Sequence, residues 1–417
     1  MKVSVIGLGY IGLPTAAILA KHQVEVIGVD VNQHVVDTIS QGRIHIVEPE
    51  LDILVREAVQ TGYLRAATKP EKSDTFIIAV PTPFKESYEP DLQYIEAAAK
   101  AIALVLEKGN MVILESTSPV GTTEKMMRWM REVRPDLVFP VFGEDSSSVD
   151  ISVAHCPERV LPGRVVQELV ENDRIIGGVT VHCAKRAKDV YGIFVKADCL
   201  VTDCRTAELG KLVENSFRDV NIAFANELSL ICDKLNINIW ELIKLANRHP
   251  RVNILQPGPG VGGHCIAVDP WFIINSAPDE ARLIHTARLV NDSKPHFVLK
   301  KIKQAVVATG KEKSEVKIAC LGLTFKPNID DLRESPALEI TKQIGVMGFS
   351  KQYLVEPNID KMPTGFDSQN TELVDLKIAL KDSDVVVLLV DHTSFKVMDL
   401  GLLSDKQVVD TRGIWVL

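Results

Sequence analysis

A glycine-rich turn between two apolar runs constrains this chain more than any other feature. Residues 2–6 are mostly apolar, three glycines follow within residues 7–12, a helical pattern comes next, and residues 24–29 form a second apolar run. Strand, glycine turn, helix and strand in this order predict a β-α-β unit. Units of this kind build parallel sheets that carry helices on both faces.

The same turn fits a dinucleotide site, because Gly7-Leu8-Gly9-Tyr10-Ile11-Gly12 has the spacing G-x-G-x-x-G. The first glycine permits the tight turn, the second lets a pyrophosphate approach the backbone, and the third lets helix and strand pack closely. The helix N-terminus offers N–H groups to the phosphates. Asp30, 18 residues after Gly12, can accept from both ribose hydroxyls and would repel a 2′-phosphate, so NAD is predicted over NADP. The alternative is a glycine turn that binds nothing. Gly7, Gly9, Tyr10, Ile11, Gly12 and Asp30 are the predicted cofactor residues.

With 417 residues, the chain is long enough for two or three domains. The first α/β domain is expected over residues 1–204, and a helical middle domain over 205–300 begins with a long helical pattern that runs from Arg205 past Leu230. A second α/β domain is expected over 301–417. The predicted fold class is therefore α/β, with two Rossmann-like parallel-sheet domains joined by a helical middle domain with a long central helix. Further strands are expected at residues 75–80, 111–114, 317–322, 352–355, 384–390 and 407–410.

Composition excludes several classes of protein. The net charge is −8 and the pI about 5.8, whereas proteins that bind nucleic acid are usually basic, so no nucleic-acid partner is expected. No apolar run approaches the roughly 18 residues that a membrane span needs, so no membrane partner is expected. The seven cysteines are scattered and include no C-x-x-C pair, which is typical of reduced thiols in the cytoplasm and argues against a zinc site or a disulfide scaffold.

Two further loops follow predicted strands. They are Val80-Pro81-Thr82-Pro83 and Ser116-Thr117-Ser118-Pro119. Because ligands of open α/β sheets bind at the carboxyl ends of strands, Thr82 and Thr117 are candidates to donate hydrogen bonds to cofactor or substrate. Ordinary turn chemistry is the alternative, since clusters of Ser, Thr and Pro form loops in any case.

Cys265 ends the glycine loop Gly262-Gly263-His264 and lies four residues before Asp269. A thiol in such a loop is accessible, and backbone N–H groups or a helix start can lower its pKa. The alternative is a small buried hydrophobic residue, which is the usual role of a cysteine.

Three polar residues fall on one face of the long helical pattern. Lys211, Asn215 and Arg218 are spaced i, i+4 and i+7, and apolar residues occupy much of the rest, so the helix is expected to be substantially buried. Burying these side chains is costly unless they meet an anion or a polar ligand. A solvated stripe is the alternative. Arginine suits phosphate and carboxylate recognition, which adds three candidate segments: 156–163, 247–251 and 325–335.

In this order, the motifs resemble the UDP-glucose/GDP-mannose dehydrogenase family over nearly the whole chain. The resemblance runs from the glycine turn through Pro157-Glu158-Arg159 and Lys211-x-x-x-Asn215 to Gly262-Gly263-His264-Cys265-x-x-x-Asp269 and Phe325-Lys326-Pro327. It implies an NAD domain, a helical middle that forms a homodimer, and a C-terminal domain that binds UDP. The implied reaction oxidises the primary alcohol of a UDP-sugar to a carboxylate with two NAD per sugar.

The resemblance also implies residue roles. Cys265 would attack the aldehyde of the first oxidation, and the thiohemiacetal would become a thioester that water hydrolyses. Lys211 and Asn215 would stabilise the developing oxyanion, with Lys211 also moving protons. Asp269 and Glu158 are candidates to orient or activate water, which Thr117 would help to order. The positions implied to bind the UDP-sugar are Arg159, Val160, Lys211, Asn215, Arg218, His249, Arg251, Gly262, Phe325, Lys326, Arg333 and Arg412, and one of the loop arginines would reach across the dimer interface.

Two segments bear on the sugar. The stretch from Asn247 to Cys265 resembles the members that act on UDP-N-acetyl-D-mannosamine, and the segment after Arg159 lacks the aromatic residue of glucose-specific members. The expected product is UDP-N-acetyl-D-mannosaminuronate for cell-surface polysaccharide synthesis, with UDP-N-acetylglucosamine or UDP-glucose as the alternative substrate. A catalytically silent nucleotide-sugar sensor is the non-enzyme alternative. The intact set of catalytic residues argues against such a sensor.

Overall fold

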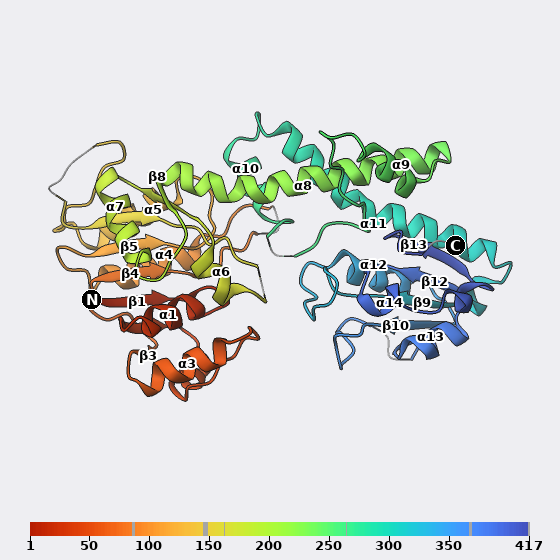
Figure 1. Cartoon of the computed structure of the whole chain (residues 1–417), viewed down its shortest axis with the longest axis horizontal. Coiled ribbons are helices and arrows are strands. Elements are labelled where there is room, and N and C mark those ends of the chain that lie inside the picture. Colours follow the sequence, from red (N-terminus) through yellow and green to blue (C-terminus); the bar gives the residue numbers. More distant parts are fainter. Residues whose placement is uncertain (86–87, 145–148, 162, 264, 367–368, 416–417) are drawn as a thin grey trace. The chain divides into compact units, whose positions relative to one another are not determined.

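A computed structural model describes residues 1–85, 88–144, 149–161, 163–263, 265–366 and 369–415. The chain divides into two compact units, Met1–Glu214 and Asn215–Leu417, and each is built around one sheet with helices packed on it (Figure 1). The predicted α/β class is therefore confirmed.

The first unit holds an eight-stranded sheet in the order β3-β2-β1-β4-β5-β6-β7-β8. All neighbours pair in parallel except β6 and β7, which are antiparallel, with Ala154 opposite Gly178. The predicted parallel sheet is therefore confirmed, with one antiparallel pairing between β6 and β7 that the sequence did not indicate. Because β7 is antiparallel to β6, the first residue of β7 lies at the edge of the sheet where β5 and β6 end. The strands are β1 (Lys2–Ile6), β2 (Glu25–Val29), β3 (Leu64–Ala67), β4 (Thr75–Ile78), β5 (Met111–Leu114), β6 (Ser152–His155), β7 (Arg174–Gly178) and β8 (Cys199–Asp203).

Both faces of this sheet are covered. Along β5, Met111 and Ile113 belong to one core cluster, whereas Val112 and Leu114 belong to another. Successive residues of a strand point to opposite faces, so an unbroken apolar strand is typical of a sheet with helices on both sides. The helices are α1 (Gly12–Lys21), α2 (Gln33–Ser40), α3 (Leu51–Gln60), α4 (Gln93–Ala103), α5 (Thr122–Val133), α6 (Val165–Glu171) and α7 (Val181–Tyr191).

Helix α8 (Cys204–Leu235) confirms the long central helix. Its expected burial is wrong along one side, because Val213, Phe217 and Phe224 are exposed by 47%, 70% and 52%. Arg218 is exposed as well, so of the three polar residues predicted to share a buried face only Lys211 is buried. The helix packs one side on its own chain and leaves apolar side chains uncovered on another.

The second unit holds a five-stranded, wholly parallel sheet in the order β11-β10-β9-β12-β13. This order repeats that of β3-β2-β1-β4-β5 in the first sheet. The strands are β9 (Lys317–Leu321), β10 (Lys351–Val355), β11 (Thr371–Leu373), β12 (Val385–Leu388) and β13 (Gln407–Asp410), with helices α9 (Ile239–Ala246), α10 (Asp269–Ser276), α11 (Arg282–Ala308), α12 (Pro336–Gly345), α13 (Leu376–Asp382) and α14 (Thr393–Lys396) and 3₁₀ turns η1 (Lys313–Glu315) and η2 (Leu400–Leu403).

Buried polar groups join α8 to α11 in this unit. Arg288 pairs with Asp219 at 2.6 Å, and Asn226 donates to Asn291 at 2.9 Å. Asn226 also accepts the N–H of Gly258 at 2.9 Å. Buried polar groups need partners, so these contacts hold α11 against α8 and hold the glycine-rich loop, at Gly258, against α8.

A second buried network lies at the carboxyl edge of the first sheet. The Glu115 side chain follows β5, is fully buried and pairs with Arg174, the first residue of β7, at 3.3 Å. Tyr191 donates to Glu115 at 3.2 Å, and the Arg174 guanidinium lies 4.6 Å from the centre of the Tyr191 ring. Burial raises the pKa of Glu115 although the Arg174 charge opposes the shift.

We expect Arg174→Met to lower the free energy of unfolding of the first unit by about 3–5 kcal/mol, because it leaves Glu115 buried without its counter-charge. Arg128→Met, at an exposed position on α5, is the matched control and should change it by less than about 0.5 kcal/mol. Differential scanning calorimetry measures both, and equal losses in the two variants would contradict the assignment. Adding Glu115→Gln to Arg174→Met should recover part of the loss.

Candidate active site

The glycine turn after β1 has the geometry that a bound pyrophosphate needs. Gly7 has φ +92°, which a residue with a side chain rarely adopts. A Cβ on Gly12 would lie 1.8 Å from the Gly7 carbonyl oxygen, so helix and loop approach too closely for any other residue. A Cβ on Gly9 would meet nothing within 4 Å, which leaves open space beside the backbone. Of the predicted neighbours, Tyr10 is exposed and Ile11 is half-buried.

Asp30 directly follows β2 and lies against this turn. One carboxylate oxygen accepts the N–H of Leu8 at 3.0 Å, and the other accepts the N–H of Asn32 at 2.9 Å. Each oxygen has a second lone pair, so the carboxylate can also accept from the hydroxyls of a ribose. These residues fit NAD.

The loops after β4 and β5 touch each other. The Thr82 hydroxyl donates to the carbonyl of Thr117, and the Ser116 hydroxyl donates to the carbonyl of Val80 at 2.7 Å. The structure thus brings the two predicted threonines together, with Thr117 half-buried. The Thr82 hydroxyl hydrogen is therefore used within the loops, whereas the hydroxyl oxygen can still accept a hydrogen bond.

Glu158 is a carboxyl group of the first unit on which the charge of Lys211 acts. Burial raises the pKa of Glu158 to about 7, although the positive charges of Lys211 and Arg174 oppose the shift. The N–H of Val160 donates to the same carboxylate. Lys211 is only 8% exposed on α8. A carboxyl group with a pKa near neutrality can both take and release a proton under ordinary conditions.

Arg159 is engaged within its own unit. Its guanidinium pairs with Glu214 at 2.6 Å and donates to the carbonyl of Asp173 at 3.0 Å. Its Nε is buried and has no hydrogen-bond partner among the described residues. A substrate anion would therefore have to compete with Glu214 for this side chain.

Cys265 and Asp269 lie one helical turn apart. The Cys265 carbonyl accepts the N–H groups of Val268 at 3.0 Å and Asp269 at 2.9 Å, which starts the turn into α10. Asp269 is 4% exposed, and its carboxylate accepts from the Asn215 side chain at 2.5 Å. Two residues that the sequence puts 54 positions apart are thus in direct contact, and one of them lies a helical turn after the half-buried Cys265.

The loop before Cys265 packs against the loop after β9. A Cβ on Gly262 would lie 2.9 Å from the Phe325 Cβ and 2.4 Å from the Glu334 carbonyl oxygen. Gly263 has φ +85°, and a Cβ there would lie 2.9 Å from the Phe325 ring. Only glycine permits this approach, so the two predicted segments are pressed together. His264, part of the predicted motif, lies outside the described residues.

The remaining predicted positions either pair with residues of their own unit or are exposed. Arg333 is exposed and pairs with Asp331 at 2.6 Å, and Arg412 pairs with Asp391 at 2.8 Å while lying against Gly258. Among the described residues, no hydrogen bond or ion pair joins the predicted cations of α8 and the 247–251 loop to the Phe325 segment. Lys326, Arg218, His249 and Arg251 are exposed, and Val160 is half-buried.

Three buried residues, Glu208, Glu356 and His392, were missed from the sequence. Glu208 on α8 accepts from Gly121 at 2.6 Å and from the Thr123 hydroxyl at 2.7 Å, and burial raises its pKa to about 7. Glu356 follows β10, and His392 lies beyond β12. Glu356 had a usable signal, because it follows its strand as Asp30 follows β2. In the part of the chain that the structure describes, no cluster of His, Cys, Asp and Glu is arranged to hold a metal ion. No helix among the described residues has the length and apolar character to cross a membrane.

Solved structures with the same architecture include a UDP-D-ManNAc dehydrogenase from Pyrococcus horikoshii. It has a TM-score of 0.88 and 38% identity, and the match covers 100% of this chain and 96% of that one. The UDP-N-acetyl-mannosamine dehydrogenase of Staphylococcus aureus gives a TM-score of 0.83 and 42% identity over 99% of this chain and 95% of its own.

Curated relatives are more similar still. One named NDP-N-acetyl-D-galactosaminuronic acid dehydrogenase, from Ralstonia nicotianae, is 62% identical over 414 residues, which are 99% of this chain and 96% of the relative. The UDP-N-acetyl-D-mannosamine dehydrogenase of Escherichia coli K12 is 60% identical over 417 residues, 99% of each chain.

Three domain models cover most of the chain. The NAD binding domain of the UDP-glucose/GDP-mannose dehydrogenase family matches residues 1–195, its central domain matches 205–293, and its UDP binding domain matches 319–416. With these three models in order along one polypeptide and relatives at this identity, the chain belongs to the UDP-glucose/GDP-mannose dehydrogenase family.

Proposed function

We propose that this chain oxidises the C6 primary alcohol of UDP-N-acetyl-D-mannosamine to the carboxylate, giving UDP-N-acetyl-D-mannosaminuronate for cell-surface polysaccharide synthesis. The observation that carries the proposal is the contact of Asn215 with Asp269, one turn after Cys265, in a chain whose Cys265 loop packs on Phe325. Relatives named for UDP-N-acetyl-D-mannosamine at 60% identity support the choice of sugar.

A second candidate sugar comes from the relatives named for N-acetyl-D-galactosaminuronic acid. They are 62% identical to this chain over 99% of its length, slightly more than those named for mannosamine. N-acetyl-D-galactosamine, the alcohol that corresponds to this uronic acid, shares with N-acetyl-D-mannosamine the N-acetyl group and the C6 alcohol that would be oxidised. The UDP-N-acetylglucosamine and UDP-glucose alternatives retain the same chemistry at C6.

The cofactor would be held by the glycine turn after β1 and by Asp30. Gly9 leaves open space for the pyrophosphate, and the Asp30 carboxylate can accept from the ribose. When bound, NAD supplies the hydride acceptor for each of the two oxidations. Thr82 and Thr117 are further candidates for contacts to the cofactor.

The residues of the chain would supply the rest of the chemistry. Glu158, whose pKa is raised by burial to about 7, takes the alcohol proton through water. With the first C6 hydride lost to the cofactor, the Cys265 sulfur would bond to the aldehyde carbon and the thiol proton would pass to the former carbonyl oxygen, whose developing charge Lys211 and Asn215 would stabilise. Loss of a second hydride leaves a thioester. Water activated by Asp269 or Glu158, and ordered by Thr117, breaks the carbon–sulfur bond and returns the thiol.

Substrate recognition is assigned to cations and loops of both sequence halves. The guanidinium groups suit the diphosphate, and the Phe325 turn suits the nucleotide. The proposed substrate residues are Arg159, Val160, Lys211, Asn215, Arg218, His249, Arg251, Gly262, Phe325, Lys326, Arg333 and Arg412.

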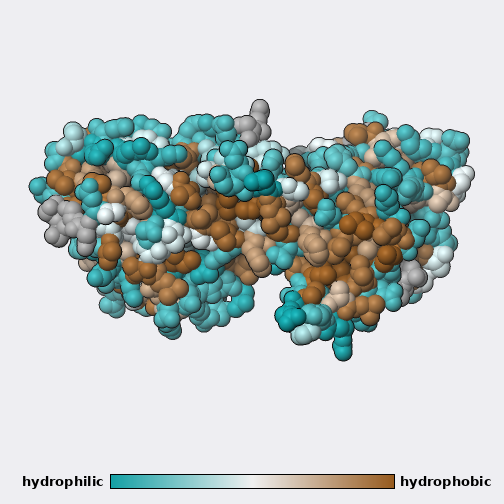
Figure 2. Space-filling model, turned by 90° about the horizontal axis from the view of Figure 1, so that it is seen from above, coloured by the Kyte–Doolittle hydropathy of each residue, from teal (hydrophilic) through white to brown (hydrophobic). Residues whose placement is uncertain are grey.

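We propose a homodimer formed through α8. Val213, Phe217, Phe224 and Ile231 are exposed on this helix at spacings of four and seven residues. Apolar side chains at such spacing form a stripe that a second copy can cover. Figure 2 shows hydrophobic side chains gathered on the face of the molecule that carries α8.

We also propose three domains, 1–204 for NAD, 205–300 for dimerisation and 301–417 for the UDP-sugar. The family's domain models, with breaks at residues 196–204 and 294–318, support this division. A cytoplasmic location is proposed because the seven cysteines are scattered along the sequence and include no C-x-x-C pair.

With purified protein and limiting UDP-N-acetyl-D-mannosamine, we expect close to two NADH per sugar, because both oxidations occur before release. NADH absorbance and chromatography of the products measure the ratio. A ratio of one with released aldehyde would sink the four-electron reaction. UDP-N-acetyl-D-galactosamine, UDP-glucose and UDP-N-acetylglucosamine serve as matched controls. A higher kcat/KM for any of them would identify that nucleotide sugar as the preferred substrate instead.

The rate should rise with pH through about 7, because Glu158 must lose its proton before it can accept one. Below that pH the carboxyl group is protonated and cannot act as a base. Glu158→Gln should lower kcat by roughly 10²–10⁴-fold and remove this limb of the pH–rate profile. An unchanged limb in Glu158→Gln would assign the titration to another group.

A further inference from the structure

The second sheet repeats the local geometry of the dinucleotide turn in the first. Gly322 follows β9 with φ +91°, as Gly7 follows β1 with φ +92°. The N–H of Leu323 donates to Glu356 at 2.8 Å, as the N–H of Leu8 donates to Asp30 at 3.0 Å. Each carboxylate directly follows the second strand of its sheet and accepts an N–H two residues further on.

The two carboxylates differ in how many donors they already serve. One Glu356 oxygen accepts from the N–H groups of Leu323 and Thr324 and lies 3.0 Å from His392 Nε2. The other accepts the backbone and side-chain N–H groups of Asn358, both at 3.1 Å. Asp30 receives only two such bonds from the described residues. Glu356 is therefore saturated where Asp30 can still accept from a ligand.

Glu356 is a buried anion that depends on these donors. Burial raises the pKa of Glu356, but the hydrogen bonds from His392 and from the N–H of Leu323 outweigh it and leave the pKa below its ordinary value. Both side chains are nearly inaccessible, with Glu356 5% and His392 1% exposed.

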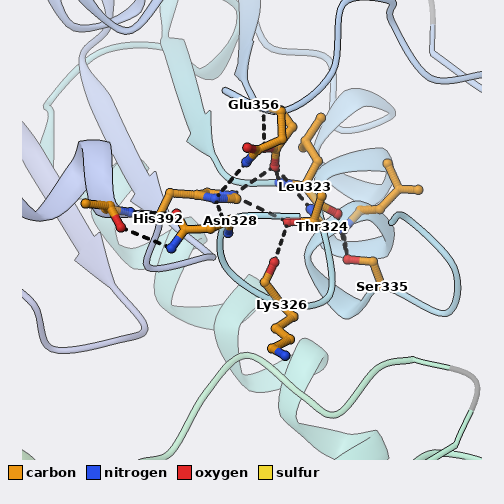
Figure 3. Close-up of polar contacts among 10 residues, drawn as sticks. Leu323, Thr324, Lys326, Asn328, Ser335, Glu356 and His392 are labelled. Atoms are coloured by element: carbon orange, nitrogen blue, oxygen red, sulfur yellow. Dashed lines mark hydrogen bonds and ion pairs between the residues drawn. The ribbon is translucent and has the colours of Figure 1, made fainter. Parts of the chain in front are cut away.

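The donors around His392 determine its tautomer. The backbone N–H of Asn328 points at Nδ1 from 3.0 Å, and the Asn358 side-chain nitrogen lies 3.1 Å from the same atom (Figure 3). A backbone N–H can only donate, so Nδ1 is the unprotonated acceptor. The ring hydrogen is then on Nε2 and is donated to Glu356. The imidazole is neutral and joins the carboxylate to the loop.

The loop held in this way is the turn from Phe325 to Asn328. Asn328 has φ +62°, a conformation that asparagine tolerates better than most residues. The side chain of Asn328 donates to the Thr393 hydroxyl and accepts the Thr393 N–H, both at 3.0 Å. The Thr324 hydroxyl donates to the Lys326 carbonyl at 2.9 Å. The turn is thus fastened at both ends to buried groups.

This turn carries the side chains that matter for the site. The Phe325 side chain lies against Gly262 and Gly263, three and two residues before Cys265, and Lys326 is exposed. A shift of the turn would move both the proposed nucleotide contacts and the support of the cysteine loop.

We propose that His392 and Glu356 are positioning residues that hold the Phe325–Asn328 turn in the conformation that receives the UDP part of the substrate. The His392 imidazole donates to Glu356, whereas Asp30, the corresponding carboxylate of the first sheet, can still accept from a ribose. The identity of the substrate rests on the proposed function.

Two substitutions separate the two ring nitrogens. The amide oxygen of His392→Asn occupies the Nδ1 position and keeps an acceptor for Asn328, whereas His392→Gln puts its amide near Nε2 and keeps only the contact to Glu356. We expect KM for the UDP-sugar to stay within about threefold of wild type in His392→Asn and to rise at least about tenfold in His392→Gln. KM for NAD should stay within about twofold in both, since the first unit binds it.

Thermal midpoints of both variants control for a general loss of structure, which would affect the two alike. Equal changes of KM for the UDP-sugar in Asn and Gln variants, or parallel changes of KM for NAD, would overturn the proposal. Calorimetric titration with UDP alone gives the same comparison without turnover. If the wild-type protein binds UDP but oxidises no UDP-sugar, the proposed function is wrong. The comparison of UDP affinities between the two His392 variants still tests the positioning role. If wild type does not bind UDP, the inference falls too.

Discussion

A carboxylate directly after the second strand of each sheet accepts the N–H that follows the glycine after the first strand. Asp30 does this for Leu8, and Glu356 does it for Leu323. Hydrogen bonds from main-chain N–H groups to an ionised carboxylate are strong and directional, so each loop is held in one conformation. The glycine turn of the first sheet and the Phe325 turn of the second both begin at these bonds. The candidate cofactor and nucleotide contacts depend on them.

Buried charges in this chain fall into two groups with different consequences. The pairs Glu115–Arg174 and Asp219–Arg288 are compensated by direct partners and serve the framework. The charge of Glu158 is opposed mainly by burial, favoured by the positive charges of Lys211 and Arg174, and opposed further by Glu115 and Glu168, so its pKa comes to about 7. Complete pairing stabilises a fold, whereas incomplete pairing leaves a proton free to move near neutral pH. The second arrangement is the one expected of a proton-transfer residue.

Much of the fold could be predicted from local patterns, because β1, β5 and β12 are short, mostly apolar runs bounded by turn residues. The strand predicted at residues 75–80 is observed only over Thr75–Ile78. The prediction extended too far because Ala79 and Val80, which follow the strand, are apolar as well. β7 was missed because it begins with Arg174, whose burial depends on a partner 59 residues away. For the site, the sequence motifs predicted Cys265, Asn215 and Asp269, but not the contact between His392 and Glu356. A lone histidine carries no local signal for the loop that it supports.

The central claim is a carbon–sulfur bond at Cys265 between the two oxidations. Acid quenching during turnover, followed by peptide mass spectrometry, tests it directly. The account predicts the mass of the substrate's acyl or hemithioacetal adduct on the peptide that contains Cys265, present in Cys199→Ser and absent in Cys265→Ser, which should lose uronate formation. Cys199 is a half-buried cysteine on β8 and is the matched control. An adduct on another cysteine, or full uronate formation by Cys265→Ser, would contradict the account.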